Sequence, residues 1–79
     1  MHLEVITPDN KLYDGEVKLV QVPGSKGSFE MLQKHAPIIS TLEKGKIKIV
    51  DEAGVESFID ITGGVVETKE NKIIILAEL

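Results

Sequence analysis

Hydrophobic and polar residues alternate with a period of two along most of this chain. Near the amino terminus, for example, Leu3 and Val5 alternate with His2 and Glu4. Such alternation, rich in β-branched side chains, is typical of strands that bury one face and expose the other. No segment carries apolar residues at a convincing helical spacing, so we predict strands almost throughout. The same alternation recurs at residues 20–22, 46–49, 58–61 and 73–77.

Two local departures from the alternation refine this prediction. Residues 73–76 are all apolar, which predicts a last strand that is buried on both faces. Residues 17–19 are out of phase with residues 20–22, which predicts a β-bulge near Lys18 and Leu19.

Turn-forming residues separate the apolar runs at intervals of about 8–12 residues, which is typical of an all-β sandwich or barrel. We therefore expect an all-β fold, a small two-sheet β-sandwich or flattened barrel of about 8–10 short strands. Residues 1–79 are expected to form this single domain. The turn signals are Pro8-Asp9-Asn10, Asp14-Gly15, Pro23-Gly24, Lys44-Gly45, Ala53-Gly54 and Glu70-Asn71.

The small size of the chain makes a partner protein a sensible expectation. In a domain of 79 residues, the free energy gained by burying apolar surface roughly cancels the entropy lost on folding. The sequence has no cysteine, so neither a disulfide nor a Cys/His zinc site can stabilise it. It also has no long apolar segment and no signal-peptide pattern, so we expect a soluble protein that is not secreted.

The charge of the chain argues against a nucleic-acid ligand. The net charge is −4, and all 9 basic residues are lysines. Without arginine, no side chain can make bidentate contacts to phosphates or base edges. The same balance argues, less strongly, against a surface that attracts anionic lipids. We therefore expect no nucleic-acid partner.

The segment from Val22 to Gly27 is the first candidate site. Its glycine-rich backbone could hold a phosphate group. However, no helix is expected after it, and Lys26 precedes Gly27 rather than following it, so the phosphate-loop pattern is absent. A hairpin or loop corner is the favoured interpretation.

His35 lies in the second candidate segment, His35-Ala36-Pro37. Catalysis would need a nucleophile or an orienting carboxylate, and Glu30 is the only carboxylate close to it in the sequence. Because Pro37 restricts the backbone before it, a shaped docking loop is favoured over a catalytic base. Phe29 and Met31 share one face of a predicted strand and belong either to the core or to an exposed contact patch.

Three lysines at alternate positions form a possible basic stripe on one strand. A solvated face, which would also protect an edge strand from mispairing, is the favoured interpretation. The lysines are Lys44, Lys46 and Lys48.

Five motifs stand in a fixed order along the chain: Val22 to Gly27, His35 to Pro37, Gly45 to Ile49, Gly63 to Glu67, and Leu76-Ala77-Glu78. In their order and spacing the chain resembles the amino-terminal β-sandwich of the epsilon subunit of F-type ATP synthases. The resemblance runs from about His2 to Glu78.

The resemblance implies a non-catalytic rotor subunit that has no catalytic residue, cofactor or metal of its own. Such a subunit packs beside the gamma subunit in the central stalk, rests on the c-ring and couples proton flow to ATP synthesis. The implied location is the cytoplasmic face of a bacterial inner membrane, reached through the complex. A monomeric state of the isolated chain is compatible with this role.

The resemblance also implies two sets of contact residues. The loops with the Pro-Gly-x-x-Gly and His-Ala-Pro motifs are expected to contact the c-ring, and one face of the sandwich is expected to contact the gamma subunit. The c-ring set is Ser25, Lys26, Gly27, Ser28, Phe29, Glu30, His35 and Ala36, and the gamma set is Thr7, Ser40 and Thr62.

The chain departs from the family pattern in two respects. It has Gln33-Lys34 where the family usually has Pro-Gly, and Glu30 where a glycine is usual. Both changes bear on the shape of the expected c-ring loop.

The second departure is at the end of the sequence. The sequence ends at Leu79, whereas many members continue into a helical hairpin that can inhibit ATP hydrolysis and in some cases binds ATP. The start at Met1 favours a natural short form over a truncated one.

Two alternatives belong to other classes of protein. Residues 66–70 are similar to the segment of lipoyl and biotinyl carrier domains that bears the modified lysine, and Lys69 would be the attachment site. The spacing to the preceding acidic residue is one short, and Glu70 stands where a small residue is expected. The other alternative is a generic β-sandwich module that binds proteins.

Overall fold

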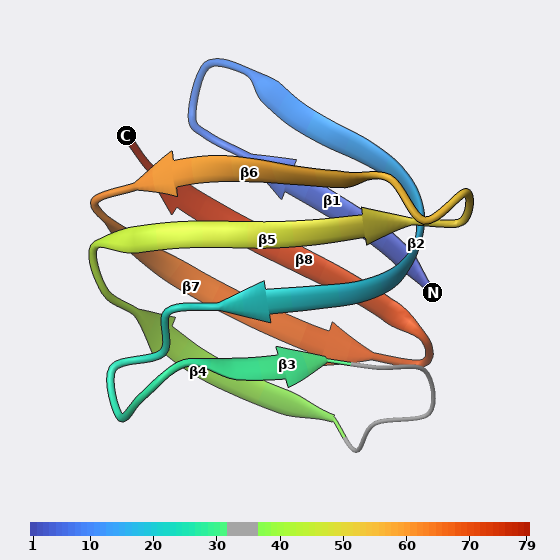
Figure 1. The fold of residues 1–79 in the computed structure, drawn as a ribbon. Helices are drawn as coiled ribbons and strands as arrows, with labels where there is room; N and C mark the ends of the chain where they lie inside the picture. Colours follow the sequence, from blue (N-terminus) through green and yellow to red (C-terminus); the bar gives the residue numbers. More distant parts are fainter. Residues whose placement is uncertain (32–36) are drawn as a thin grey trace.

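The computed structural model describes residues 1–31 and 37–79, with Met31 described by its backbone alone. The described residues form eight strands and no helix (Figure 1). No helix among them is therefore long and apolar enough to cross a bilayer. The strands are β1 (His2–Ile6), β2 (Lys11–Val22), β3 (Phe29–Met31), β4 (Ile38–Leu42), β5 (Gly45–Asp51), β6 (Glu56–Ile61), β7 (Gly63–Lys69) and β8 (Lys72–Glu78).

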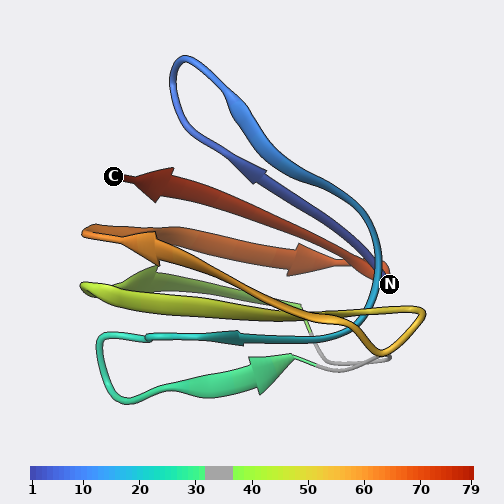
Figure 2. The ribbon, with the colours of Figure 1, turned by 45° about the horizontal axis from the view of Figure 1, so that its top comes forward.

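The strands follow one another in a single curled path, in the order β4-β7-β8-β1-β2-β5-β6, with β3 paired to β2. Strands β1 and β8 pair in parallel, and the other pairs are antiparallel. Figures 1 and 2 show that the path folds back on itself, so that β5 and β6 lie over β7 and β8. The predicted all-β fold, a small sandwich or flattened barrel, is confirmed.

Strand β2 joins the two layers because it is long and bends in its middle. Its first half pairs with β1, and its second half pairs with β5 and β3. The register of the β2–β5 pair shifts between Val17 and Leu19, which confirms the predicted bulge. A bulge bends its strand and increases the local twist, and here it lies where β2 passes from one layer to the other.

The two layers are also joined by a backbone bridge between Gly24, in the loop after β2, and Leu42 of β4. The core lies between the layers and consists of the inward positions of the alternating strands. Aliphatic side chains from both layers are fully buried in this core, which is the outcome that strict alternation predicts. The largest of them are Leu3, Ile47, Ile49, Ile73, Ile75, Val5, Val17, Val20, Val22 and Val66.

The prediction that the last strand is buried on both faces is wrong. In β8, Ile73 and Ile75 are buried, but Ile74 is only half-buried and the side chain of Leu76 is 51% exposed. The physical reason is that β8 belongs to one layer of a two-layer fold. Ile73 and Ile75 on its inner face belong to the core cluster, whereas Leu76 on its outer face remains exposed.

Candidate docking surfaces

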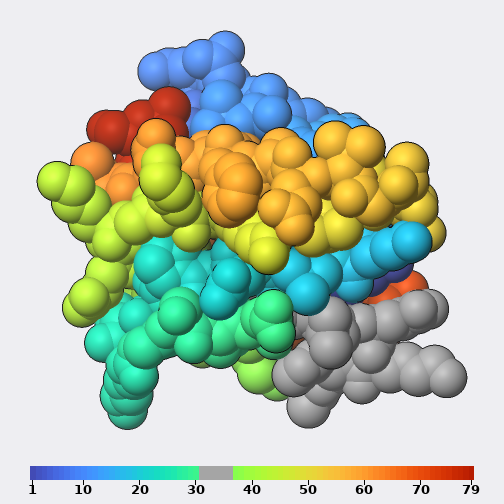
Figure 3. Space-filling view, viewed as in Figure 1, coloured from blue at the N-terminus to red at the C-terminus, as the bar shows by residue number. Residues whose placement is uncertain are grey.

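The turn surface, residues 24–30, comprises the loop after β2 and the first two residues of β3, and it protrudes from the corner of the molecule (Figures 1 and 3). Hydrogen bonds tie its base to the neighbouring chain segments. The Ser25 amide donates to the Thr41 carbonyl at 3.2 Å, and the Glu43 amide donates to the Pro23 carbonyl at 2.7 Å. The Ser25 and Thr41 hydroxyls also lie 2.8 Å apart. The turn surface therefore projects from an anchored base.

Most of the c-ring set lies exposed on this turn, as Ser25, Lys26, Gly27, Ser28 and Glu30. His35 and Ala36 lie outside the described residues. The amide of Gly27 donates to the Gly24 carbonyl at 3.0 Å, and Gly27 has a φ of 117°, which favours glycine. Because the Gly27 and Ser25 amides are both engaged within the chain, the structure favours the loop-corner interpretation over a phosphate cradle.

Phe29 belongs to the edge of the core rather than to a free contact patch. Its side chain is half-buried and packs against the core cluster. Its ring also covers Gly24 so closely that a Cβ at Gly24 would lie 2.6 Å from the ring. A charged residue at position 29 would therefore disturb packing as well as any docking. Met31 shares the strand, but only its backbone is described.

The second surface, the outer face, lies on the solvent side of the layer formed by β4, β7, β8 and β1. Strand register places Val65, Leu76 and Ile6 side by side in one row across β7, β8 and β1. The next row carries Ile39 opposite Glu67, followed by Ile74 and Glu4. The outer face is therefore apolar along one row and mixed in the next.

An open groove of about 420 Å³ lies on the apolar side of the outer face. Its lining comes from the ends of β1 and β8 and from the start of β7, and it includes Thr7 of the gamma set. The Thr7 hydroxyl accepts a 3.0 Å hydrogen bond from the Asn10 amide, which orders the β1–β2 turn. An apolar groove with ordered walls is suited to receive apolar side chains of a partner protein.

The other two residues of the gamma set are placed differently. Thr62 is exposed between β6 and β7, and its amide and hydroxyl both donate to the Glu78 carbonyl, at 2.8 and 3.2 Å. Glu78 also lines the groove, so Thr7 and Thr62 lie near the same end of β8. Ser40 is half-buried in β4 and alternates with the exposed Ile39, so it faces the interior rather than the outer face.

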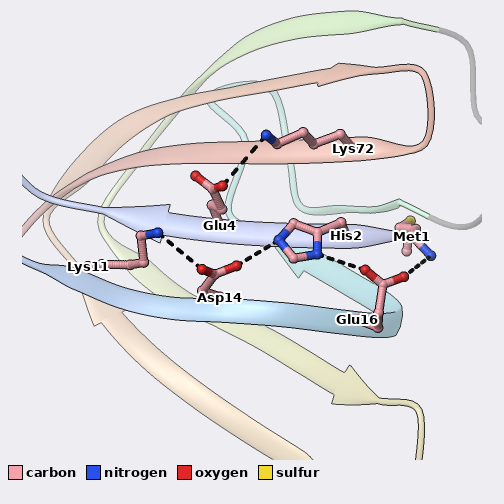
Figure 4. A network of polar contacts seen from close by, with 7 residues as sticks. All are labelled: Met1, His2, Glu4, Lys11, Asp14, Glu16 and Lys72. Carbon is pink, nitrogen blue, oxygen red and sulfur yellow. Dashed lines mark hydrogen bonds and ion pairs between the residues drawn. The ribbon is translucent and has the colours of Figure 1, made fainter.

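The polar end of the layer carries a network of ion pairs that sequence reasoning missed (Figure 4). His2 contacts Glu16 through Nδ1 at 2.7 Å and Asp14 through Nε2 at 2.6 Å. Hydrogen bonds to Glu16 and then Asp14 raise the pKa of His2 above its usual value. Lys11 lies 3.0 Å from Asp14, and hydrogen bonds from Lys11 and His2 lower the pKa of Asp14.

This network is the arrangement in the described residues that comes closest to a metal site. Ligand atoms of His2, Glu4 and Asp14 all lie within 4.8 Å of one another. However, Glu4 pairs with Lys72 at 3.6 Å, and Asp14 is already shared between His2 and Lys11. The donors are therefore satisfied by cations of the chain itself, and we interpret the group as an ion-pair network.

Of the three lysines of the predicted stripe, Lys46 and Lys48 lie on β5, and the exposed Lys44 lies just before it. Their side chains reach solvent, as the favoured interpretation held, but they do not protect an edge. Strand β5 is paired on both sides, with β2 and β6. Lys46 pairs with Asp60 at 2.7 Å and Lys48 with Glu56 at 3.6 Å. Exposed pairs of this kind contribute little to stability.

Comparison with known proteins decides between the remaining interpretations. All of residues 1–79 match the family model described as "ATP synthase, Delta/Epsilon chain, beta-sandwich domain". The chain belongs to this family. It is also 40% identical over 78 residues to the ATP synthase epsilon chain of Caulobacter vibrioides, covering 99% of this chain and 90% of that relative. The match favours an ATP synthase subunit over a carrier domain modified at Lys69, which is an exposed residue beside the β7–β8 turn.

Two solved structures share the fold of this epsilon-family chain. A chain of the Euglena gracilis mitochondrial ATP synthase OSCP/F1/c-ring assembly aligns with a TM-score of 0.86 at 18% identity, over 95% of this chain. A chain of the Tetrahymena thermophila mitochondrial ATP synthase central stalk/c-ring aligns with a TM-score of 0.80 at 21% identity, over 100% of this chain. The present chain spans 48% and 63% of those two chains, respectively.

Proposed function

We propose that this chain is the epsilon subunit of an F-type ATP synthase, a non-catalytic part of the central stalk. In this role it binds the gamma subunit and the c-ring and helps to couple proton flow to ATP synthesis. The observation that carries the proposal is the 40% identity to an epsilon chain over nearly the whole of both chains. The location that follows is peripheral, on the cytoplasmic face of a bacterial inner membrane.

Contact with the gamma subunit is assigned to the outer face and its groove. The cores of protein interfaces are depleted of charged residues and rich in well-packed apolar side chains. Of the two docking surfaces, the outer face offers the longer apolar row, with Ile6, Val65 and Leu76 side by side. Thr7 lines the groove, and Thr62 lies at the same end of β8.

Contact with the c-ring is assigned to the turn surface together with His35 and Ala36. The turn protrudes and is anchored by Ser25, so a partner can meet it without large rearrangement of the sandwich. Its exposed residues are small and uncharged, apart from the charged residues Lys26 and Glu30. Such a surface is suited to meeting the polar loops that connect membrane helices.

The experiment is immunoprecipitation of the chain from membranes of its source, followed by identification of what comes down. The proposal predicts that the gamma subunit and the c-ring subunit are recovered together with it. Recovery of the chain without either subunit would overturn the proposal.

A pair of matched variants tests the assignment of the outer face. Leu76→Glu places a charge in the apolar row and should release the gamma subunit. Phe58→Glu changes a similarly exposed residue on the other layer, where the side chain is 56% exposed against 51% for Leu76, and should leave binding intact. Equal binding by both variants would show that the gamma subunit uses another surface.

A further inference from the structure

His2 is held between two carboxylates of the neighbouring strand. It faces outward from β1, directly opposite Glu16, and its ring also reaches Asp14 one side-chain position away on the same face. Directly opposite and diagonal partners are the pairs that interact across antiparallel strands. Both ring nitrogens lie within 2.7 Å of a carboxylate oxygen (Figure 4).

This geometry requires a protonated ring. An ionised carboxylate can only accept hydrogen bonds, and a neutral imidazole has one donor nitrogen and one acceptor nitrogen. Only the imidazolium form donates from both nitrogens, so loss of a proton from the ring breaks one of the two hydrogen bonds. We propose that His2 is a pH-sensitive switch that holds the β1–β2 hairpin closed while its ring is protonated.

The charged groups around His2 leave the two carboxylates available to it. On β2, Lys11 contacts Oδ2 of Asp14, whereas His2 contacts Oδ1. The amino group of Met1 contacts Oε1 of Glu16 at 3.7 Å, whereas His2 contacts Oε2. On β1 and β8, Glu4 and Lys72 pair with each other. Each of the two carboxylates therefore contacts His2 through one oxygen and another cation through its other oxygen.

The hairpin is the part of the sheet where such a switch has most effect. Within the described residues, the first half of β2 pairs with β1 alone, because pairing with β5 begins at Val17. Figure 2 shows this hairpin extending beyond the rest of the sheet. Leu12 and Tyr13 pack on the core only in part. Segments with few buried contacts open locally at low free energy. The two exposed contacts of His2 are individually weak, but they act on a half-strand that itself opens at low free energy, so their loss changes its opening measurably.

The pH range of the switch follows from the direction of the two shifts. Because the pKa of His2 is raised in the folded chain, its contribution is complete below the usual histidine value of about 6.5 and is lost as the pH rises through the folded value. Because the pKa of Asp14 is lowered, its contribution is complete above about 4 and is lost as the pH falls through the folded value. The hairpin should therefore be most tightly closed between about pH 4 and 6.5.

Amide hydrogen exchange of residues 11–16 tests the switch, with the ring signal of His2 followed by NMR across the same pH range. After correction for the intrinsic pH dependence of exchange, protection should fall severalfold as the pH rises through the titration of His2. His2→Gln should abolish this step, and Glu16→Gln should move the His2 titration to lower pH. Lys46→Gln, which breaks an exposed ion pair that contains no histidine, should keep the step.

Protection of residues 11–16 that has the same pH profile in the wild type and in His2→Gln would overturn the proposal. A His2 titration at or below the value of an unstructured peptide would do so too. The switch does not rest on the proposed function. Because Ile6 and Thr7 line the groove, however, opening of the hairpin would also alter the outer face.

Discussion

Gly64 lies on β7, opposite Ala77 of β8. It has a φ of 154°, and a Cβ there would lie 2.3 Å from the carbonyl oxygen of Leu76. Neither the conformation nor the space admits another side chain. Gly64, the second glycine of the Gly63-Gly64 motif, thus has a structural role in pairing these two strands.

Gly64→Ala is expected to lower the free energy of unfolding by at least about 2 kcal/mol, because a strained φ and a backbone clash act together. Urea denaturation followed by circular dichroism measures the loss. Gly54→Ala is the matched control, since Gly54 also has a positive φ of 84° but open space around it. It should cost about 1 kcal/mol. Equal losses in the two variants would show that the contact with Leu76 is unimportant.

Some features of individual residues could be predicted from the sequence, and others could not. The alternating pattern assigned Leu3 and Val5 to the core correctly, because it depends only on neighbours in the chain. The roles of Phe29 and His2 depend on contacts across strands, with Gly24 under the ring of Phe29 and with carboxylates 12 and 14 residues away from His2. Alternation alone does not fix such cross-strand register.

At the scale of elements, β8 shows that a residue can be apolar for two reasons, burial in the core of the fold or burial against a partner. Ile75 is fully buried, whereas its neighbour Leu76 faces solvent on the outer face. The run of apolar residues in the sequence is compatible with burial by the fold and with burial by a partner. Sequence reasoning chose the first explanation for both faces, and the structure supports it for one face only.

Ile75→Ala should cost about 2–5 kcal/mol of unfolding free energy, because it leaves a cavity in the core. Leu76→Ala should cost less than about 1 kcal/mol, because the side chain is largely exposed. Chemical denaturation of the isolated chain measures both. A loss for Leu76→Ala as large as that for Ile75→Ala would mean that the outer face is covered within the chain itself.

At the scale of the whole molecule, the fold follows from features that were visible in the sequence. Period-two alternation and regular turns predicted an all-β sandwich or flattened barrel, and the phase change predicted the bulge at which β2 bends. The two docking surfaces were less predictable. Their contact residues came from the family resemblance, and of the gamma set only Thr7 lines the groove, whereas Ser40 faces the interior.

The arrangement of the molecule suits a part that joins two partners. The turn surface lies at one corner and the outer face on one layer, so two partners can be bound without competing for the same residues. A small sandwich with little core to spare would also gain stability from being held between them, because a partner that binds only the folded chain stabilises it.

Titration of the purified chain with purified gamma subunit, followed by isothermal calorimetry, tests the central claim most directly. The proposal predicts saturable one-to-one binding with a negative heat-capacity change, since apolar surface of the outer face becomes buried. Absence of binding by a correctly folded chain would contradict the assignment of this protein to the central stalk.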